Sequence, residues 1–127
     1  MKTYIQLFAL LMMVLVSQVN HAQVNMNAFK EKNISEIKSM LMSDVSLKIG
    51  SNKKIKGAEQ AITAIRQTLN EFEPVKMEMK HEGSSMKEDD YMIAKLVNAQ
   101  NQTLRVFVHL ENSTGGKKIC DIKIRRS

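Results

Sequence analysis

The stretch that decides the fold is Leu104-Arg105-Val106-Phe107-Val108-His109-Leu110, in which every second residue is aliphatic. This period of two is typical of a half-buried β-strand with one face toward a core. The same period recurs on both sides of it, in residues 75–82, 91–97 and 120–124. Polar segments at 83–90, 98–102 and 112–116 separate the runs. The sequence therefore predicts four strands in an antiparallel meander with one apolar face.

The residues before the meander predict helices that cover this face. Asn33 and Glu36 have the spacing of a helix N-cap with a capping box. Apolar residues follow at helical spacing: Ile34, Ile37, Met40 and Leu41. A longer apolar stripe at 58–72 predicts a second helix, which Pro74 ends. Residues 26–32 predict one or two further helical turns. The fold class is therefore α+β, with the helices packed on one face of the sheet.

One more strand is expected between the two helices. Val45, Leu47 and Ile49 alternate with polar residues there, and Gly50 ends the run.

The first 22 residues have the order of a secretory signal peptide. Lys2 precedes an apolar run at 5–16, a polar run follows, and Ala22 supplies a small residue before Gln23. A membrane-spanning helix needs about 20 apolar residues, and this run is much shorter. We expect cleavage between Ala22 and Gln23, a single domain at 23–127, and a protein exported to the periplasm or the medium without a membrane span.

Composition restricts the partners and the chemistry of that domain. The formal charge of +6 falls to +5 without Lys2, but the lysines are scattered along the chain and few aromatic residues remain to stack on bases. We therefore expect no nucleic-acid partner. Cys120 is the only cysteine, so no internal disulfide forms. Because it alternates with Ile122 and Ile124, we expect a buried and inert thiol.

Several strings resemble the family called domain of unknown function 4783, within the nuclear-transport-factor-2-like superfamily. The resemblance covers nearly the whole mature chain and rests on residues 44–49, 81–85, 91–96, 104–108 and 119–124, in this order and spacing. It implies an exported protein of Bacteroidota and a cone-like fold, in which a curved sheet wraps around helices and leaves a pocket. The family offers no established activity. The chain departs from the pattern at residues 98–102, which lack a glycine, and at Arg125-Arg126, where an acid is expected.

The superfamily that the chain resembles includes isomerases and dehydratases with acid-base groups inside the cone. Here the strand positions that face inward are almost all apolar, and the only acid expected inside is Asp44, at a strand start. Among titratable residues His81 shares the inward parity of Met77 and Met79, yet no partner base or orienting acid is evident. A structural histidine is therefore favoured over a catalytic one, and we assign no catalytic residue.

The same weighing gives no metal site and no cofactor. The histidines and Cys120 lie on different elements, without the close ligand spacing of zinc sites. A pocket is expected at Phe72, Met79 and His81.

The opposite sheet face is expected to form a homodimer interface. Its residues include Tyr91, Ile93, Arg105 and Phe107, which combine an apolar centre with a polar rim.

Taken together, the residues favour an exported, non-catalytic binding domain for a small apolar ligand or a protein partner. Two alternatives stay open. One is a small cone-fold enzyme that uses His81 as general acid or base, and the other is a structural dimer module.

Overall fold

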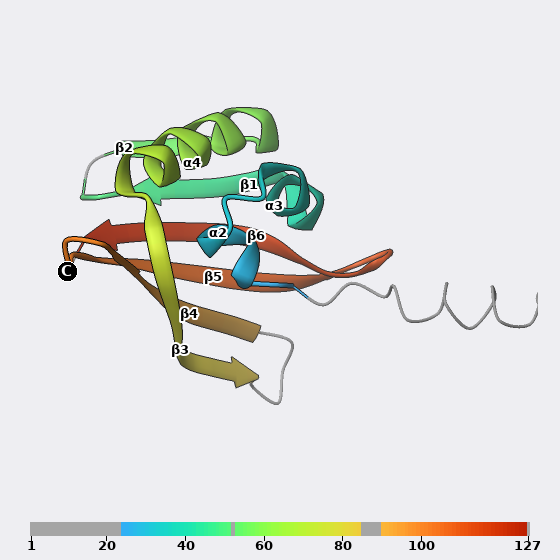
Figure 1. The fold of residues 1–127 in the computed structure, drawn as a ribbon. Helices are drawn as coiled ribbons and strands as arrows, with labels where there is room; N and C mark the ends of the chain where they lie inside the picture. The colour runs from blue at the N-terminus through green and yellow to red at the C-terminus, as the bar shows by residue number, and fades with distance from the viewer. Residues whose placement is uncertain (1–23, 52, 85–89, 127) are drawn as a thin grey trace, which may run out of the picture.

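The computed structural model describes residues 24–51, 53–84 and 90–126, with the backbone alone for 81–84. The expected signal segment and its cleavage point at Ala22 and Gln23 lie outside these residues. The elements follow in the order α2 (Asn27–Lys30), α3 (Ile34–Met40), β1 (Leu41–Ile49), β2 (Lys53–Lys56), α4 (Ala58–Phe72), β3 (Pro74–Ser84), β4 (Asp90–Asn98), β5 (Thr103–Ser113) and β6 (Gly116–Arg126) (Figure 1).

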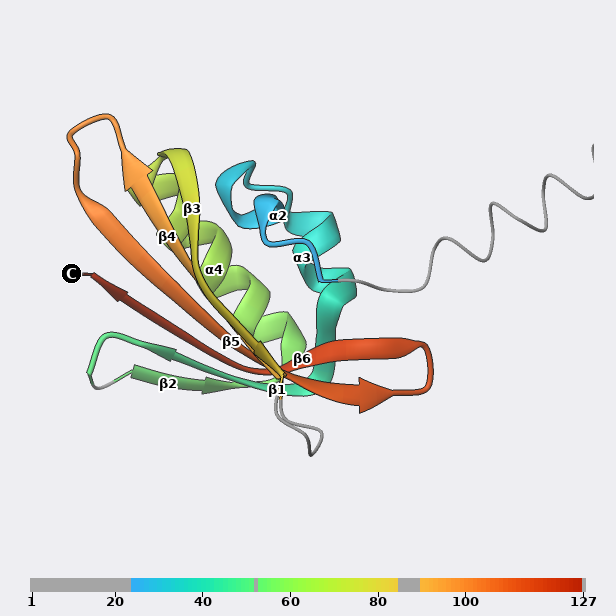
Figure 2. The ribbon, with the colours of Figure 1, turned by 90° about the horizontal axis from the view of Figure 1, so that it is seen from below.

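The strands form one six-stranded sheet in the order β2-β1-β6-β5-β4-β3. Strands β3 to β6 pair antiparallel with their neighbours in sequence, which confirms the predicted meander. The sheet continues because β1 pairs in parallel with β6. The strands fan apart when the sheet is seen from below (Figure 2), as expected for a strongly twisted sheet.

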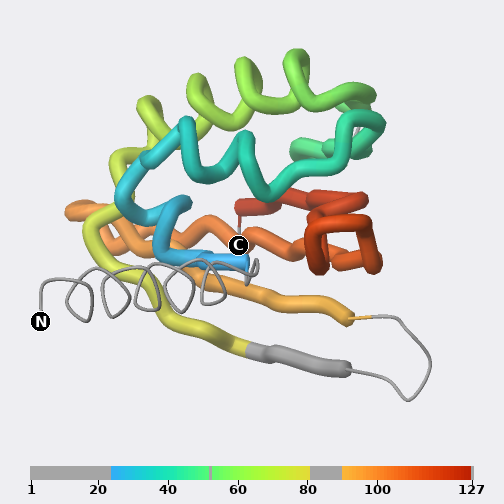
Figure 3. The backbone as a smooth tube through the Cα atoms, turned by 90° about the vertical axis from the view of Figure 1, so that its right-hand side faces the viewer, coloured from blue at the N-terminus to red at the C-terminus, as the bar shows by residue number. Residues whose placement is uncertain are grey.

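The helices form a layer on one face of the sheet, in which α4 lies over β1, α3 lies beside α4, and α2 contacts α3 and β3 (Figures 1 and 3). The core between the layers is aliphatic with two phenylalanines, Phe29 and Phe72, and it includes Ile37, Leu47, Ile65, Leu69, Leu96, Val106 and Ile122. The α+β class is therefore confirmed.

The ends of the helices follow the expected signals with one difference. The Asn33 side chain accepts a hydrogen bond from the Glu36 backbone N–H at 3.2 Å, so the predicted N-cap is confirmed. Leu41, expected in this helix by spacing, is instead extended and begins β1. Helix α4 ends as predicted, with Glu73 left-handed and Pro74 next.

Strand β2 was not predicted, because Lys53-Lys54-Ile55-Lys56 holds a single apolar residue. Ile55 lies opposite the buried Leu47 in the pairing of β2 with β1. Burial of this one side chain, rather than a visible alternation, is the favourable contact that the strand makes with the core.

The turn between β4 and β5 forms without the glycine that the family resemblance implies. Asn101 adopts a φ of 63°, a left-handed conformation that asparagine tolerates better than most residues. The Asn98 side-chain oxygen accepts hydrogen bonds from the backbone N–H groups of Gln100 at 3.1 Å and Gln102 at 2.8 Å. Asn101 therefore adopts the left-handed conformation expected of a glycine, and Asn98 stabilises the turn with its side chain.

Register shifts occur in three of the strand pairs, and two of these shifts affect residues singled out in the sequence. In the β5–β6 pair His109 lies opposite Asp121, but Leu110 lies opposite Ile119, so Cys120 is the extra residue of a β-bulge. Ile119 is buried and Cys120 is half-buried. The expectation that Cys120 is buried in line with Ile122 is therefore wrong.

The second shift lies in the pairing of β3 with β4. Met79 lies opposite Ala94, which faces the core, whereas His81 lies opposite Ile93 in the adjacent row. The inward parity assigned to His81 assumed an unbroken alternation, and this bulge breaks it.

Candidate functional site

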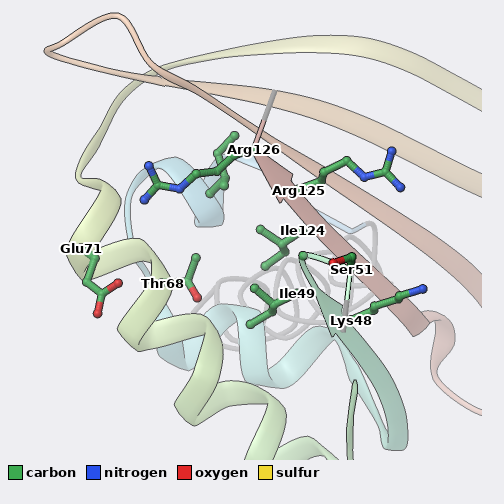
Figure 4. A pocket seen from close by; sticks show the side chains of 10 residues that line it. Lys48, Ile49, Ser51, Thr68, Glu71, Ile124, Arg125 and Arg126 are labelled. Carbon is green, nitrogen blue, oxygen red and sulfur yellow. The ribbon is translucent and has the colours of Figure 1, made fainter. Parts of the chain in front are cut away.

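A cleft of about 630 Å³ opens at the end of the sheet where β1 and β6 finish, against the last turns of α4. We call it the end cleft. Its lining residues are Lys48, Ile49, Gly50, Ser51, Thr68, Glu71, Leu104, Ile124, Arg125 and Arg126. Figure 4 shows Thr68 and Glu71 on the helix to one side and Ile49, Ile124 and Arg126 at the strand ends on the other.

The floor of the end cleft is apolar. Leu104 and Ile124 are buried core residues, and Ile49 packs partly buried against them. They lie on the inner face because Ile49 is opposite Ile124 in the parallel β1–β6 pair. Of these three residues Ile49 is the least buried, so it presents most of the accessible aliphatic surface.

The rim of the end cleft is predominantly cationic. Arg126 extends toward α4, where its guanidinium lies 5.8 Å from the centre of the Phe72 ring. Lys48 and Arg125 line the other side and point away from Arg126 (Figure 4). The one acid in the lining is Glu71, which accepts a hydrogen bond from the Gln67 amide at 3.3 Å. Three cations against one carboxylate give the cleft a positive field.

The comparison with known families identifies the chain. Residues 22–125 match the family described as Domain of unknown function (DUF4783). The chain belongs to the DUF4783 family. No curated protein matches the sequence.

Solved structures show the same fold. A DUF4783 family protein from Bacteroides ovatus is 17% identical, with 84% of this chain and 96% of that chain covered, at a TM-score of 0.74. A DUF4783 family protein from Bacteroides uniformis is 24% identical, with 80% of this chain and 92% of that chain covered, at a TM-score of 0.70. A de novo designed protein with a curved β-sheet is 13% identical, with 77% and 88% covered, at 0.62. Nuclear-transport-factor-2-like and cystatin-like folds occur among the other similar structures, so the expected fold is confirmed.

The pocket expected in this DUF4783 domain joined Phe72, Met79 and His81, and neither Phe72 nor Met79 lines the end cleft. Phe72 is 2% exposed and lies beside the end cleft, under Arg126. Met79 is 41% exposed on β3, at the opposite edge of the sheet from β2. The side chain of His81 lies outside the described residues, so its role in a pocket stays a prediction.

The expected dimer face lies on the outer face of the sheet, the face turned away from the helices. Ile93 is opposite Phe107, and the rings of Tyr91 and Phe107 stack with centroids 6.0 Å apart. Lys123 covers the Phe107 ring at 5.9 Å, and Arg105 is exposed beside them. The apolar centre of this face is therefore already partly covered by neighbouring side chains of the same chain. The homodimer stays a prediction.

Cys120 and His109 meet on the same outer face. The Cys120 Sγ lies 3.5 Å from His109 Nδ1 and donates to the His109 carbonyl oxygen at 3.4 Å. Burial, followed by a hydrogen bond with Glu111, raises the pKa of the thiol to about 11. A nucleophilic cysteine requires the opposite shift, so this pair has the wrong electrostatics for thiolate chemistry.

Asp90 is an inward acid that sequence reasoning assigned to a loop. It is 8% exposed, forms an ion pair with Lys117, and keeps one carboxylate oxygen without a hydrogen-bond partner. Asp44, the acid expected inside, is exposed. The missed signal is the period of two, which runs back from Ala94 through Met92 to Asp90.

Two further absences concern the described parts of the chain alone. Within residues 24–51, 53–84 and 90–126, no three histidine, cysteine, aspartate or glutamate side chains are grouped to hold a metal ion. No helix among them is long and apolar enough to cross a bilayer.

Proposed function

We propose that this DUF4783 domain is an exported, non-catalytic binding protein whose end cleft takes a small molecule with an apolar body and an anionic head. The observation that supports this most directly is the pairing of an aliphatic floor, Ile49, Leu104 and Ile124, with the cationic rim that Arg126 leads. The sequence predicts a small apolar ligand, and the cationic rim adds to this proposal an anionic group at one end of the ligand.

The size of the end cleft suits such a ligand. Its volume of about 630 Å³ lies within the roughly 300–1,000 Å³ of ordinary small-molecule sites. Burial of apolar ligand surface contributes about 25 cal/mol per Å². A ligand with an apolar chain and a carboxylate would place the chain beside Ile49 and the carboxylate near Arg126 at the rim.

The lining of the end cleft supports binding rather than catalysis. Among its described residues Glu71 is the only acid, and histidine, cysteine and tyrosine are absent. General acid-base catalysis needs a proton donor or acceptor positioned against a second group. An enzyme that uses His81 remains the alternative, and a buried acid within hydrogen-bond reach of that ring would favour it.

We also propose that the protein is exported, because residues 1–22 have the basic, apolar and polar order of a signal peptide. N-terminal sequencing of protein from the native host should find a mature chain beginning near Gln23. An intact Met1 would contradict it.

The binding proposal is tested with decanoate and decanol, which share a chain length and differ in the charged head. Isothermal titration of the mature protein should show decanoate binding more tightly than decanol. Arg126→Ala should weaken decanoate about tenfold, as expected for a lost charge-assisted hydrogen bond. Arg66→Ala is the matched control, because Arg66 is exposed on α4 and does not line the cleft. No binding of decanoate, or equal losses in both variants, would refute the proposal.

A further inference from the structure

Six of the cations on the outer face of the sheet lie on neighbouring strands although they are scattered along the sequence. They are Lys48, Lys54, Lys95, Arg105, Lys123 and Arg125, and they come from five neighbouring strands. Lys95 is half-buried and the other five are exposed.

The strand pairing arranges these cations in two rows of three. Lys54 lies opposite Lys48, which in turn lies opposite Lys123. In the next row Lys95 lies opposite Arg105, which lies opposite Arg125. Neighbouring strands are about 4.8 Å apart, and like charges directly opposite each other destabilise a sheet. The isolated domain therefore carries an electrostatic cost that an anionic partner would remove.

The domain itself does little to neutralise the two rows. Glu78 lies 3.9 Å from the Lys95 ammonium and also contacts Lys76. Among the described residues, none of the other five cations has a carboxylate within ion-pair distance. The rows are thus left open to an external anion.

The shape of the face favours a flexible chain over a flat surface. The rows span five strands, about 19 Å at the usual strand spacing. Each step between strands adds about 20–25° of twist, and the fanned strands of Figure 2 show the accumulated rotation. A planar bilayer would meet only part of the array, whereas a linear polymer can follow all of it.

The side chains around the rows narrow the class of polymer. A single-stranded nucleic acid binds by stacking bases on aromatic faces, but the Tyr91 and Phe107 rings stack on each other and Lys123 covers Phe107. A peptide needs a free strand edge or side-chain pockets, and both rows cross paired strands, with Lys54 alone on an edge. An acidic polysaccharide needs neither, because its carboxylates are bound by ammonium and guanidinium groups alone.

We propose that the outer face binds an extended anionic polysaccharide, which lies across the strands from β2 to β4 along the two rows of cations. This surface differs from the end cleft, although Lys48 and Arg125 also line that cleft. The proposal does not depend on a ligand in the cleft.

Polygalacturonate is the probe, because it is linear and carries a carboxylate on each sugar, with neutral dextran as its uncharged counterpart. Binding to the mature protein, measured by biolayer interferometry at low salt, should occur with polygalacturonate, weaken as salt rises, and be absent with dextran. Lys54→Glu/Lys123→Glu should lower the affinity at least tenfold. These two positions lie in the rows and outside the end cleft.

The matched control is Lys30→Glu/Arg66→Glu, which changes the net charge equally at exposed positions on the helical layer. It should lower the affinity less than twofold, and urea unfolding should show both variants folded. Equal losses in the two variants would mean attraction by net charge alone and would overturn the proposal, as would no binding of polygalacturonate. Tighter binding of oligo(dT) or of anionic vesicles would overturn the choice of polymer. A stable dimer that masks the face against polygalacturonate would overturn it in favour of a second copy.

Discussion

The guanidinium of Arg126 lies 5.8 Å from the centre of the Phe72 ring, which joins the end of β6 to the last turn of α4. Phe72 is buried and Arg126 is exposed. The aromatic ring therefore holds the cation at the rim of the end cleft while leaving its N–H groups accessible to a ligand.

Loss of this contact should have a measurable effect on stability. A cation–π contact at an exposed site contributes about 0.5–1 kcal/mol, so Arg126→Ala should lower the free energy of unfolding by that amount. Arg125→Ala is the control, because Arg125 is exposed and its guanidinium lies over no aromatic ring of the described residues. Urea unfolding measures both. A control that loses as much as Arg126→Ala would remove the role assigned to Phe72.

Substitutions at Asn101, the left-handed residue of the β4–β5 turn, should change the stability of the fold according to how well they tolerate a positive φ. Asn101→Gly should leave the protein at least as stable, because glycine adopts a positive φ without steric cost. Asn101→Val should lower the free energy of unfolding by about 1–2 kcal/mol. Gln100→Val, at a neighbouring exposed position without a positive φ, should change it by less than about 0.5 kcal/mol. Thermal denaturation ranks the variants, and a tolerated valine at 101 would contradict the turn geometry.

The bulge in β6 predicts that truncation of two adjacent residues will cost very different amounts of stability. Ile119→Ala should cost about 2–5 kcal/mol, the usual range for truncating a buried isoleucine, because Ile119 is fully buried. Cys120→Ala should cost less than about 1 kcal/mol, since its side chain is half-buried on the outer face. If chemical denaturation instead finds Cys120 the more costly position, the uninterrupted alternation would be correct.

The Cys120 thiol should stay neutral well above physiological pH. Burial and the neighbouring Glu111 raise its pKa from 9.0 to about 11, and the thiolate is the reactive form. The rate of alkylation by iodoacetamide should therefore still rise about tenfold per pH unit near pH 10. A rate that levels off near pH 9, as for a free thiol, would show that the site does not perturb Cys120.

The raised pKa of Cys120 also makes the stability of the fold depend on pH. The unfolded thiol loses its proton as pH rises through 9.0, while the folded one keeps it up to about 11. The folded state is therefore favoured by the neutral thiol below pH 9, and this contribution is lost between about pH 9 and 11.

Lys117 should stabilise the fold by neutralising Asp90. Lys117→Ala leaves the buried Asp90 carboxylate without its ion-pair partner and should lower the free energy of unfolding by about 2 kcal/mol. The control Lys53→Ala removes an exposed ammonium and should change it by less than about 0.5 kcal/mol. Equal effects in urea unfolding would mean that Asp90 needs no counter-charge.

The strands and helices could be predicted because their signals are local. Alternation at 104–110 marks β5, Asn33 marks the start of α3, and Pro74 marks the end of α4, each within a few residues of chain. The bulges could not be predicted this way, since no residue type marks the position where an extra residue enters β3 or β6. One such residue exchanges the two faces, and for this reason Cys120 was assigned the wrong side.

The candidate sites depend on pairings between distant segments, which alternation does not specify. The end cleft exists because β1 pairs in parallel with β6 and brings Lys48 and Ile49 beside Ile124 and Arg125. One row of cations, Lys54, Lys48 and Lys123, depends on the same pairing, whereas the other row forms within the meander, and the lysines therefore look scattered in the sequence. Asp90 was missed because its strand begins earlier than the hydrophobic run suggests.

The parallel pairing of β1 with β6 also fixes the order in which the native sheet can form. Chains emerge from the ribosome with the N-terminus first, and β6 is made after the other five strands of this sheet although it lies between β1 and β5. Until its final residues are available, β1 and β2 on one side have no hydrogen-bonded route to the meander on the other. The sheet therefore closes only after β6 has been made, and a chain that lacks β6 loses the middle of the sheet rather than an edge.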